Sequence, residues 1–240
     1  MLQEPGNIAL IPARSGSKRL PNKNKLIFKG LPLLAHSILV ALESDCFLEV
    51  VVSTDDKEIA DIAKKYGAKV PNLRPKEFAT DESSDIEWLI YAINNQISIP
   101  LTKIDFLTIL RPTSPMRTSM TINRAVNVLK NSEWADSLRA MELTDKHPGK
   151  MWYLAETGEA LPLWDQTREL IPTHNRPTQS LPKVWVQNAS LEIVRLQAVL
   201  STNSISGKRV LGFEMPGLEG FDINSERDWN YLNFLISENR

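Results

Sequence analysis

Cysteine is almost absent from this sequence, which has a single one at position 46. One cysteine excludes an intramolecular disulfide, and such sparing use of cysteine is typical of proteins in the reducing cytoplasm. Histidine is also scarce, and His36, His147 and His174 do not combine with Cys46 at the spacings of zinc ligands. We therefore expect a cytoplasmic protein without a zinc site.

Long apolar runs and a large net charge are absent as well. No apolar stretch approaches the ~20 residues needed to span a bilayer, and residues 1–7 lack the basic region and apolar core of a signal peptide. The formal net charge is −1, so we expect neither nucleic acid nor a membrane as a partner. The 240 residues can form one sizeable domain with a single core.

Two common phosphate-binding motifs are also missing, because neither the Walker A spacing nor G-x-G-x-x-G occurs. A different stretch points to anions. Ile8 to Ile11 is apolar and short enough for a buried strand, and the loop after it carries five basic residues with no acidic residue between them. Gly16 and its flanking serines leave the backbone free to curl around an anion. The pattern predicts a phosphate cradle, and a solvated basic loop is the alternative. The five basic residues are Arg14, Lys18, Arg19, Lys23 and Lys25.

Strands and helices are predicted to alternate as far as residue 142. Such alternation is typical of an α/β protein with a doubly wound, mostly parallel sheet. Asp55 or Asp56 can cap one helix, and Ser83 or Ser84 can cap the next. The expected strands cover 48–53, 104–110, 137–142, 183–195 and 210–215, and the expected helices cover 31–42, 57–66, 85–95 and 118–130, with a last helix after 225.

The segment from Leu143 to Leu181 interrupts this alternation with prolines, glycines and scattered aromatic residues. We interpret it as an excursion from the sheet that includes short strands such as Met151–Leu154. Its aromatic content fits an interface with another chain. A loose local core is the alternative.

The basic loop resembles the signature of the acylneuraminate cytidylyltransferase (CMP-sialic acid synthetase) family. In that family a strand ending I-P-A-R is followed by a Gly/Ser turn, a Lys and a P-x-K-N segment. Residues 11–14 (IPAR), 15–18 (SGSK) and 21–24 (PNKN) match these parts in order and spacing.

Three later motifs extend the resemblance to residue 228. Residues 111–117 (RPTSPMR) resemble the family's Q-P-T-S-P-[LM]-R, with Arg111 in place of the common glutamine. The strand at 183–195 resembles V-x-x-N-G-[AS]-I-Y, with Ala189 in place of glycine. Residues 222–228 resemble D-[IV]-[DN]-[ST]-x-x-D, with Asn224 at the third position.

The resemblance implies a fold like that of nucleotide-diphospho-sugar transferases, in one domain over 1–240 with a dimerisation lobe at 143–181. It implies transfer of CMP from CTP to an acidic nine-carbon sugar, with Mg²⁺ as cofactor and a homodimer as the assembly. A 3-deoxy-octulosonate cytidylyltransferase or another nucleotidyltransferase is an alternative. A further alternative is a non-catalytic nucleotide-binding protein with the same fold, because a fold does not dictate a function.

The resemblance also implies roles for particular residues. Asp222 is expected to end a strand and to bind Mg²⁺ together with Asn224, whereas Ser225 and Asp228 are spaced as a helix cap and are expected to be structural. The expected catalytic residues are Arg14, Lys18, Lys23 and Asp222, the nucleotide-binding residues are Ala13, Arg14, Ser15, Gly16, Asn24, Thr80, Ser83 and Ser84, and the sugar-binding residues are Arg111, Pro112, Thr113, Ser114, Lys150, Arg176, Gln187 and Asn188.

Overall fold

The structure is a computed structural model that describes residues 6–164 and 171–238. The chain divides into two units, one made of the residues up to 140 together with those from 188 onward, and the other of residues 141–187. Residues 165–170 of the expected lobe at 143–181 lie outside the described residues. No helix in the described ranges is long and apolar enough to cross a membrane.

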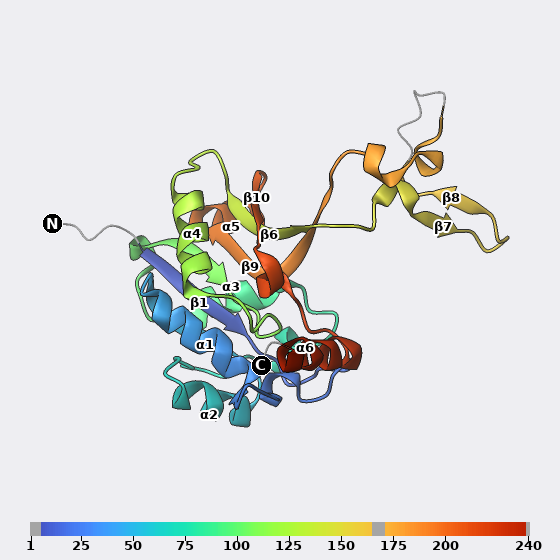
Figure 1. The fold of residues 1–240 in the computed structure, drawn as a ribbon. Helices are drawn as coiled ribbons and strands as arrows, with labels where there is room; N and C mark the ends of the chain where they lie inside the picture. Colours follow the sequence, from blue (N-terminus) through green and yellow to red (C-terminus); the bar gives the residue numbers. More distant parts are fainter. Residues whose placement is uncertain (1–5, 165–170, 239–240) are drawn as a thin grey trace. The chain divides into compact units, whose positions relative to one another are not determined.

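A six-stranded sheet forms the centre of the first unit (Figure 1), with strand order β10-β6-β9-β5-β1-β4. β1 pairs in parallel with β4 and with β5, whereas β9 pairs antiparallel with β5. The prediction of a doubly wound, mostly parallel α/β sheet is thus confirmed. The strands are β1 (Gly6–Pro12), β4 (Phe47–Ser53), β5 (Ile104–Ile109), β6 (Ser137–Leu143), β9 (Trp185–Arg195) and β10 (Val210–Glu214).

The helices expected at 57–66, 85–95 and 118–130 and after residue 225 are confirmed, whereas the short helix at Leu196–Thr202 was not predicted. Asp56 caps the second helix, since its Oδ1 accepts from the Ile59 N–H at 2.9 Å. The first helix was expected to begin at residue 31, which is wrong, because Leu31–Pro32 (β3) pairs with Ile27–Phe28 (β2) in a small hairpin. The helices are α1 (Leu33–Ser44), α2 (Lys57–Lys65), α3 (Asp85–Asn95), α4 (Ser119–Lys130), α5 (Leu196–Thr202) and α6 (Glu226–Glu238).

Helices cover both faces of the sheet because alternate residues of its strands point to opposite sides. On one face, α1, α2 and α4 bury a large apolar cluster, and on the other α3 and α5 bury a second. The first cluster includes Ala9, Ile11, Val50, Val52, Ile38 and Ile122, and the second includes Ile8, Leu10, Val51, Leu89 and Val199.

A third apolar cluster joins the C-terminal helix to the basic loop. Leu20 and Phe28 from the N-terminal region pack with Leu33, Ile223 and Leu232, and all five side chains are buried. At about 25 cal/mol per Å² of apolar surface removed from water, such burial is the main force that holds this loop in place. The loop is therefore anchored by residues some 200 positions away in the sequence.

Asp228 fixes the start of α6, as the sequence predicts. Its Oδ2 accepts from the Asn224 N–H at 2.9 Å and from the Ser225 N–H at 2.8 Å. The expectation that Asp222 ends a strand is wrong, because Asp222 follows the 3₁₀ turn at Gly217–Gly220.

The second unit contains a short antiparallel hairpin and several 3₁₀ turns. β7 (Trp152–Leu154) pairs with β8 (Ala160–Pro162), which agrees with the short strand expected at 151–154. His147 is buried, with Nε2 3.0 Å from the Pro182 carbonyl oxygen, Nδ1 accepting from the Gly149 N–H at 3.0 Å, and its ring stacked on Trp164. This unit therefore has a small core of its own. The 3₁₀ turns of the chain are η1 (Lys23–Lys25), η2 (Lys76–Phe78), η3 (Leu101–Lys103), η4 (Pro148–Lys150), η5 (Thr173–Asn175), η6 (Thr178–Ser180) and η7 (Gly217–Gly220).

Candidate active site

A pocket of about 590 Å³ opens at the carboxyl ends of β1 and β5. The residues that follow β1 form one side of it, and Arg111, Pro112 and Thr113, which follow β5, form another. Loops at the carboxyl ends of parallel strands meet at one edge of the sheet, which is where open α/β sheets bind ligands.

The basic loop contributes its cations to this pocket. Arg14 donates to Asp81 Oδ1 at 2.7 Å and to the Thr80 carbonyl oxygen at 2.5 Å, and Lys18 Nζ lies 2.5 Å from Asp81 Oδ2. These hydrogen bonds, from Lys18 first and then Arg14, hold the pKa of Asp81 below its ordinary value. Asp81 thus accepts from both cations, and an incoming anion would compete with it for the same donors.

Lys23 and Asn24 tie the loop to its surroundings. Lys23 Nζ donates to the Ile223 carbonyl oxygen at 3.1 Å, and Asn24 donates to the Arg14 carbonyl oxygen at 3.0 Å. Burial lowers the pKa of Lys23 from its ordinary value, and the nearby carboxylate of Asp222 opposes that shift. A half-buried ammonium group beside the pocket interacts more strongly with an anion than an exposed one would.

Asp222 presents an oxygen atom that has no partner within the protein. Its Oδ2 accepts from Asn224 Nδ2 at 2.5 Å, whereas its Oδ1 is buried and makes no hydrogen bond. The Asn224 side-chain oxygen accepts from Arg19 at 3.5 Å. Within the described residues, no group of three or more His, Cys, Asp or Glu side chains could hold a metal ion. A single carboxylate nevertheless fits Mg²⁺, which binds one or two carboxylates plus water and substrate phosphates.

Arg74 lines the pocket, although the sequence did not predict it as a site residue. Only 4% of it is exposed, and burial lowers the pKa of its guanidinium to about 10. Its Nε and Nη2 have no hydrogen-bond partner, and its Cζ lies 5.9 Å from the centroid of the Trp88 ring. Unpaired buried donors are costly, so those that line a pocket are candidates for binding a ligand. An isolated arginine in a polar loop gives no sequence signal of this kind.

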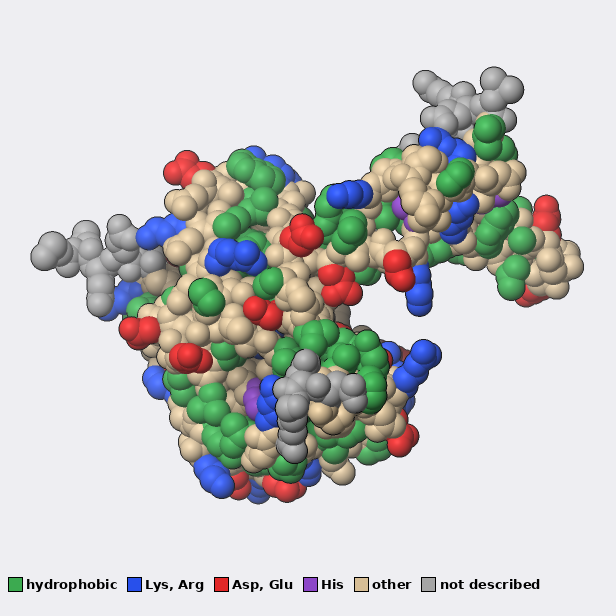
Figure 2. Space-filling model, viewed as in Figure 1, with side chains coloured by type: hydrophobic (Ala, Val, Ile, Leu, Met, Phe, Trp, Pro, Cys, Tyr) green, Lys and Arg blue, Asp and Glu red, His purple; other side chains and the backbone are tan. Residues whose placement is uncertain are grey.

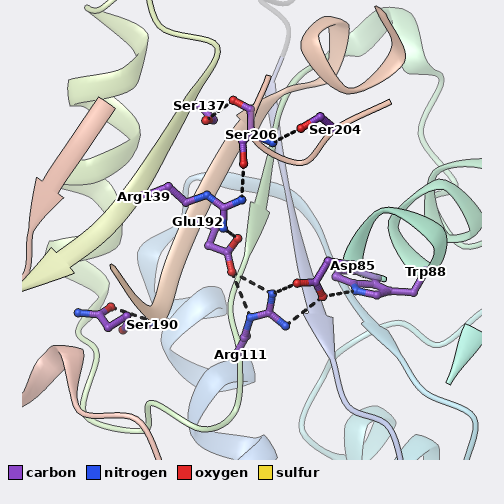
Figure 3. A network of polar contacts seen from close by, with 10 residues as sticks. Asp85, Trp88, Arg111, Ser137, Arg139, Ser190, Glu192, Ser204 and Ser206 are labelled. Atoms are coloured by element: carbon purple, nitrogen blue, oxygen red, sulfur yellow. Dashed lines mark hydrogen bonds and ion pairs between the residues drawn. The ribbon is translucent and has the colours of Figure 1, made fainter. Parts of the chain in front are cut away.

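The pocket wall also contains an ion-pair network. Arg111 bridges Asp85 at the start of α3 and Glu192 of β9 (Figure 3), and Trp88 donates to Asp85 Oδ1 at 2.8 Å. Neither Asp85 nor Glu192 was expected to belong to the site, because their link to Arg111 depends on the strand order. Arg19 of the predicted basic loop lines the pocket too, and the other lining residues outside the predicted site are Pro12, Ser17, Leu20, Phe78, Asp81, Trp88 and Ala189.

Many of the predicted site residues meet at this pocket. Ser15 lies outside its lining and pairs with Asp55 through its N–H at 2.9 Å and its hydroxyl at 2.7 Å. The Ser84 N–H donates to the Glu87 carboxylate at the start of α3. A Cβ atom on Gly16 would meet nothing within 4 Å, so this conformation does not require a glycine there. The predicted residues that line the pocket are Arg14, Lys18, Lys23, Asn24, Thr80, Ser83, Arg111, Pro112, Thr113, Asp222 and Asn224, and those of this unit that do not are Ala13, Ser15, Gly16, Ser84, Ser114 and Asn188.

The remaining predicted sugar-binding residues, Lys150, Arg176 and Gln187, belong to the second unit. Within it, Lys150 Nζ donates to the carbonyl oxygens of His174 at 2.7 Å and Arg176 at 2.5 Å. Arg176 donates to the Ser180 carbonyl oxygen at 3.4 Å. These contacts stabilise the loop that carries η5.

A parallel sheet with a cationic pocket beyond its first strand is an arrangement typical of α/β proteins that bind phosphorylated ligands. The family model described as "Cytidylyltransferase" matches residues 8–150. The chain belongs to the cytidylyltransferase family, as the motif resemblance predicted.

Two curated relatives and one solved structure illustrate the similarity. The chain is 48% identical over 235 residues to the CMP-N,N'-diacetyllegionaminic acid synthase of Legionella pneumophila, covering 97% of each chain. It is 41% identical over 237 residues to the pseudaminic acid cytidylyltransferase of Campylobacter jejuni (serotype O:23/36), again covering 97% of each. A solved CMP:2-keto-3-deoxy-manno-octonic acid synthetase complexed with CTP matches with a TM-score of 0.68 and 15% identity over 98% of this chain and 100% of that one. At that identity the structural match shows a shared fold.

Replacing Arg74 by Met tests whether its buried charge serves a ligand. We expect the free energy of unfolding to stay the same or rise, because the change removes an unpaired buried cation. The affinity for CTP should fall by about 10-fold or more, the scale of a hydrogen bond from a charged group. Denaturant unfolding and calorimetric titration measure the two effects. A loss of stability with unchanged CTP affinity would show that Arg74 has a packing role.

Proposed function

We propose that this protein transfers CMP from CTP to the anomeric hydroxyl of an acidic nine-carbon sugar and releases pyrophosphate. The observation that carries this proposal is the cationic pocket itself, in which Arg14, Lys18, Lys23 and Arg74 face the same space as the unpartnered oxygen of Asp222. The two relatives, which cover nearly its whole length and act on sugars of this class, support it.

In the proposed reaction the sugar oxygen forms a bond to the α-phosphorus of CTP. The bond from that phosphorus to the bridging oxygen breaks, pyrophosphate leaves, and the hydroxyl proton passes to solvent. We assign no general base. Arg14 and Lys18 donate hydrogen bonds to the phosphate oxygens, and the half-buried Lys23 stabilises the charge that develops on the leaving group.

Mg²⁺ is the cofactor we propose, with Asp222 as the residue that would hold it. When bound, the ion neutralises phosphate charge that would otherwise repel the incoming oxygen. Asn224 donates to one Asp222 oxygen and leaves the other without a partner, so it orients the carboxylate. Asn224 therefore holds the Asp222 carboxylate in place, and its side-chain oxygen is an additional candidate ligand of Mg²⁺.

N,N'-diacetyllegionaminic acid is the sugar we would test first, because the relative at 48% identity is described as making its CMP derivative. Pseudaminic acid is the second sugar to test, because the relative at 41% identity is described as a pseudaminic acid cytidylyltransferase. The 3-deoxy-octulosonate alternative is supported by similarity of fold alone, at 15% identity. We place the reaction in the cytoplasm, which agrees with the single cysteine of the chain.

Pyrophosphate release tests the proposal directly. The purified protein would be incubated with Mg²⁺, each of CTP, UTP, ATP and GTP, and each of the sugar acids above. We expect release with CTP and a nine-carbon sugar acid. A preference for UTP would overturn the nucleotide assignment, and nucleotide binding without release under any combination would favour a non-catalytic binding protein.

Lys18→Ala should lower kcat/KM by about 10²-fold or more, the scale seen when one group that stabilises transition-state charge is removed. The side chain of Lys18 is 82% exposed, so its loss should not affect folding. Lys64→Ala, which removes an exposed lysine from α2, is the matched control and should keep full activity. Steady-state kinetics of the native protein, Lys18→Ala and Lys64→Ala measure the effect. Equal kcat/KM values in Lys18→Ala and the native protein would refute a role of the basic loop in the reaction.

Asp222→Asn should raise the Mg²⁺ concentration needed for half-maximal rate, because it removes the only charge we assign to the metal site. Asn224→Asp should lower that concentration if the side chain faces the ion, since it adds a second carboxylate. Asp228→Asn is the structural control, expected to cost about 1 kcal/mol of folding stability through a weakened helix cap. Metal titrations of the rate and thermal unfolding curves separate these effects. If Asp228→Asn abolishes the metal dependence and Asp222→Asn does not, the ligand is misassigned.

We further propose that the unit at 141–187 forms a homodimer interface with a second copy of this chain. Several large apolar side chains of this unit are exposed, and hydrophobic side chains are visible on its surface in Figure 2. Tyr153 is 62% exposed and Leu154 is 79% exposed. Exposed apolar groups that cluster on a small unit are typical of an interface.

Sedimentation equilibrium at micromolar concentration should therefore give about twice the 27.1 kDa chain mass. Replacing Tyr153 and Leu154 together by Ser should shift the equilibrium toward monomer, because it removes apolar surface that the interface would bury. Replacing Met120, which is 76% exposed on α4, by Ser is the control and should leave the assembly unchanged. A native protein that sediments at the mass of one chain would rule the dimer out.

A further inference from the structure

Arg111 of the pocket wall lies between the carboxylates of Asp85 and Glu192 in Figure 3 and donates hydrogen bonds to both. It donates to Asp85 from Nη1 at 3.2 Å and from Nη2 at 2.7 Å. It donates to Glu192 from Nε at 3.1 Å and from Nη2 at 3.0 Å. An arginine has five N–H donors, so these contacts use four of them.

Glu192 is shared with a second arginine, which makes the network electrically balanced. Arg139 of β6 forms an ion pair with Glu192 and also donates to Ser206 Oγ at 2.8 Å. Two arginines therefore neutralise two carboxylates. A cation already paired in this way has little charge left for a substrate carboxylate, so Arg111 is poorly suited to the direct sugar contact that the motif implied.

Asp85 lines the pocket and has an oxygen that can accept a further hydrogen bond. Its Oδ1 accepts from Trp88 and from Arg111, whereas the only contact of Oδ2 in Figure 3 is with Arg111. The side chain is 39% exposed and lines the pocket. Because an ionised carboxylate has about four acceptor positions, Oδ2 can accept one more hydrogen bond.

The charged groups around Asp85 keep it ionised. Burial by itself raises the pKa of Asp85, but the opposing effect of Arg111 outweighs it and holds the pKa below its ordinary value. Arg139 of β6 acts in the same direction, Arg74 before η2 is a further cation near Asp85, and Glu192 of β9 is the other anion of the network. Asp85 is therefore an acceptor with no proton to donate.

We infer that Asp85 Oδ2 accepts a hydrogen bond from a neutral N–H or O–H group of a bound substrate, and that Arg111 is a positioning residue which acts through Asp85. This inference rests on the proposed function and adds a residue that selects the substrate. A fixed carboxylate attracts an N–H or O–H group and repels a carbonyl or phosphate oxygen at the same place. The donor is either an amine on the nucleotide base or a hydroxyl or acylamino group on the sugar, and the affinity for each substrate distinguishes these two sources.

A double-mutant cycle with Asp85→Asn, Arg111→Gln and the combined variant tests this inference. The affinity for CTP, and that for N,N'-diacetyllegionaminic acid in the presence of CMP, would be measured by calorimetry, with KM and kcat from initial rates. Asp105→Asn is the matched control, since Asp105 is 41% exposed and lies 3.9 Å from Arg195 outside the pocket lining. Glu192 keeps its pairing with Arg139 in Arg111→Gln, and thermal unfolding reports whether each variant is folded.

We expect Asp85→Asn to weaken the binding of one substrate by about 10- to 100-fold, with a smaller change in kcat. A change confined to CTP places the donor on the nucleotide, and a change confined to the sugar acid places it on the sugar. Arg111→Gln alone should weaken the binding of the same substrate by a similar factor. In the Asp85→Asn background it should weaken binding by less than about 2-fold more, because the effects of coupled residues are not additive. Arg111→Lys should recover part of the loss, since it restores the charge without the fork of donors.

A pH profile separates this role from a purely structural one. Binding through the Asp85 carboxylate is present above its pKa and is lost as the pH falls through it. Without Arg111 that pKa rises, so Arg111→Gln should lose affinity at a higher pH than the native protein does.

Unchanged affinity for both substrates in Asp85→Asn would overturn the inference. So would full additivity of the two substitutions, because it would mean that Arg111 contacts the substrate itself. The calorimetric titrations need no turnover. A native protein that binds both substrates but releases no pyrophosphate would therefore refute the proposed function and still decide the role of Asp85.

Discussion

Parallel pairing of β1 with β4 and β5 is the constraint on which the pocket depends. The register that places Leu10 opposite Val51 and Ile109 makes these strands end at one edge of the sheet. Backbone hydrogen bonds extend the alignment past the strands, since the Leu110 N–H donates to the Leu10 carbonyl oxygen and the Ala13 N–H to that of Ser53. A one-residue slip would reverse the faces of the strands and also separate the basic loop from Arg111.

Two buried arginines lower the folding stability of this unit, because burying a charged group removes its hydration. Arg117 is buried, and desolvation lowers its pKa to about 9. It donates to the Ser190 carbonyl oxygen and to Ser37 Oγ, and so joins β9 to α1 through neutral acceptors. Arg74 has two nitrogens without any acceptor. Both buried cations cost free energy of folding. Arg74 lines the pocket, so a bound ligand could recover part of that cost, whereas Arg117 lies outside the pocket lining and serves the fold.

The sequence predicts the fold better than the site for a physical reason. Hydrophobic periodicity and helix caps are local, so the bounds of α3 and the cap at Asp56 follow from neighbouring residues. The basic loop could be recognised for the same reason, being contiguous. Asp85 and Glu192 are distant from Arg111 in sequence, and only the strand order brings them together. The predicted start of α1 was two residues too early, because Leu31 and Pro32 pair with β2 in a hairpin and do not join the helix.

The cluster of Leu20, Phe28, Leu33, Ile223 and Leu232 has a consequence for how the protein is made. Synthesis proceeds from the N-terminus, so the first strand and the basic loop leave the ribosome long before α6 does. The sheet can begin to pair while the loop still lacks the apolar surface against which it packs. The loop would then be fully packed only after residues 223–232 emerge and complete the cluster. A nascent chain therefore carries a core well before it carries a usable pocket.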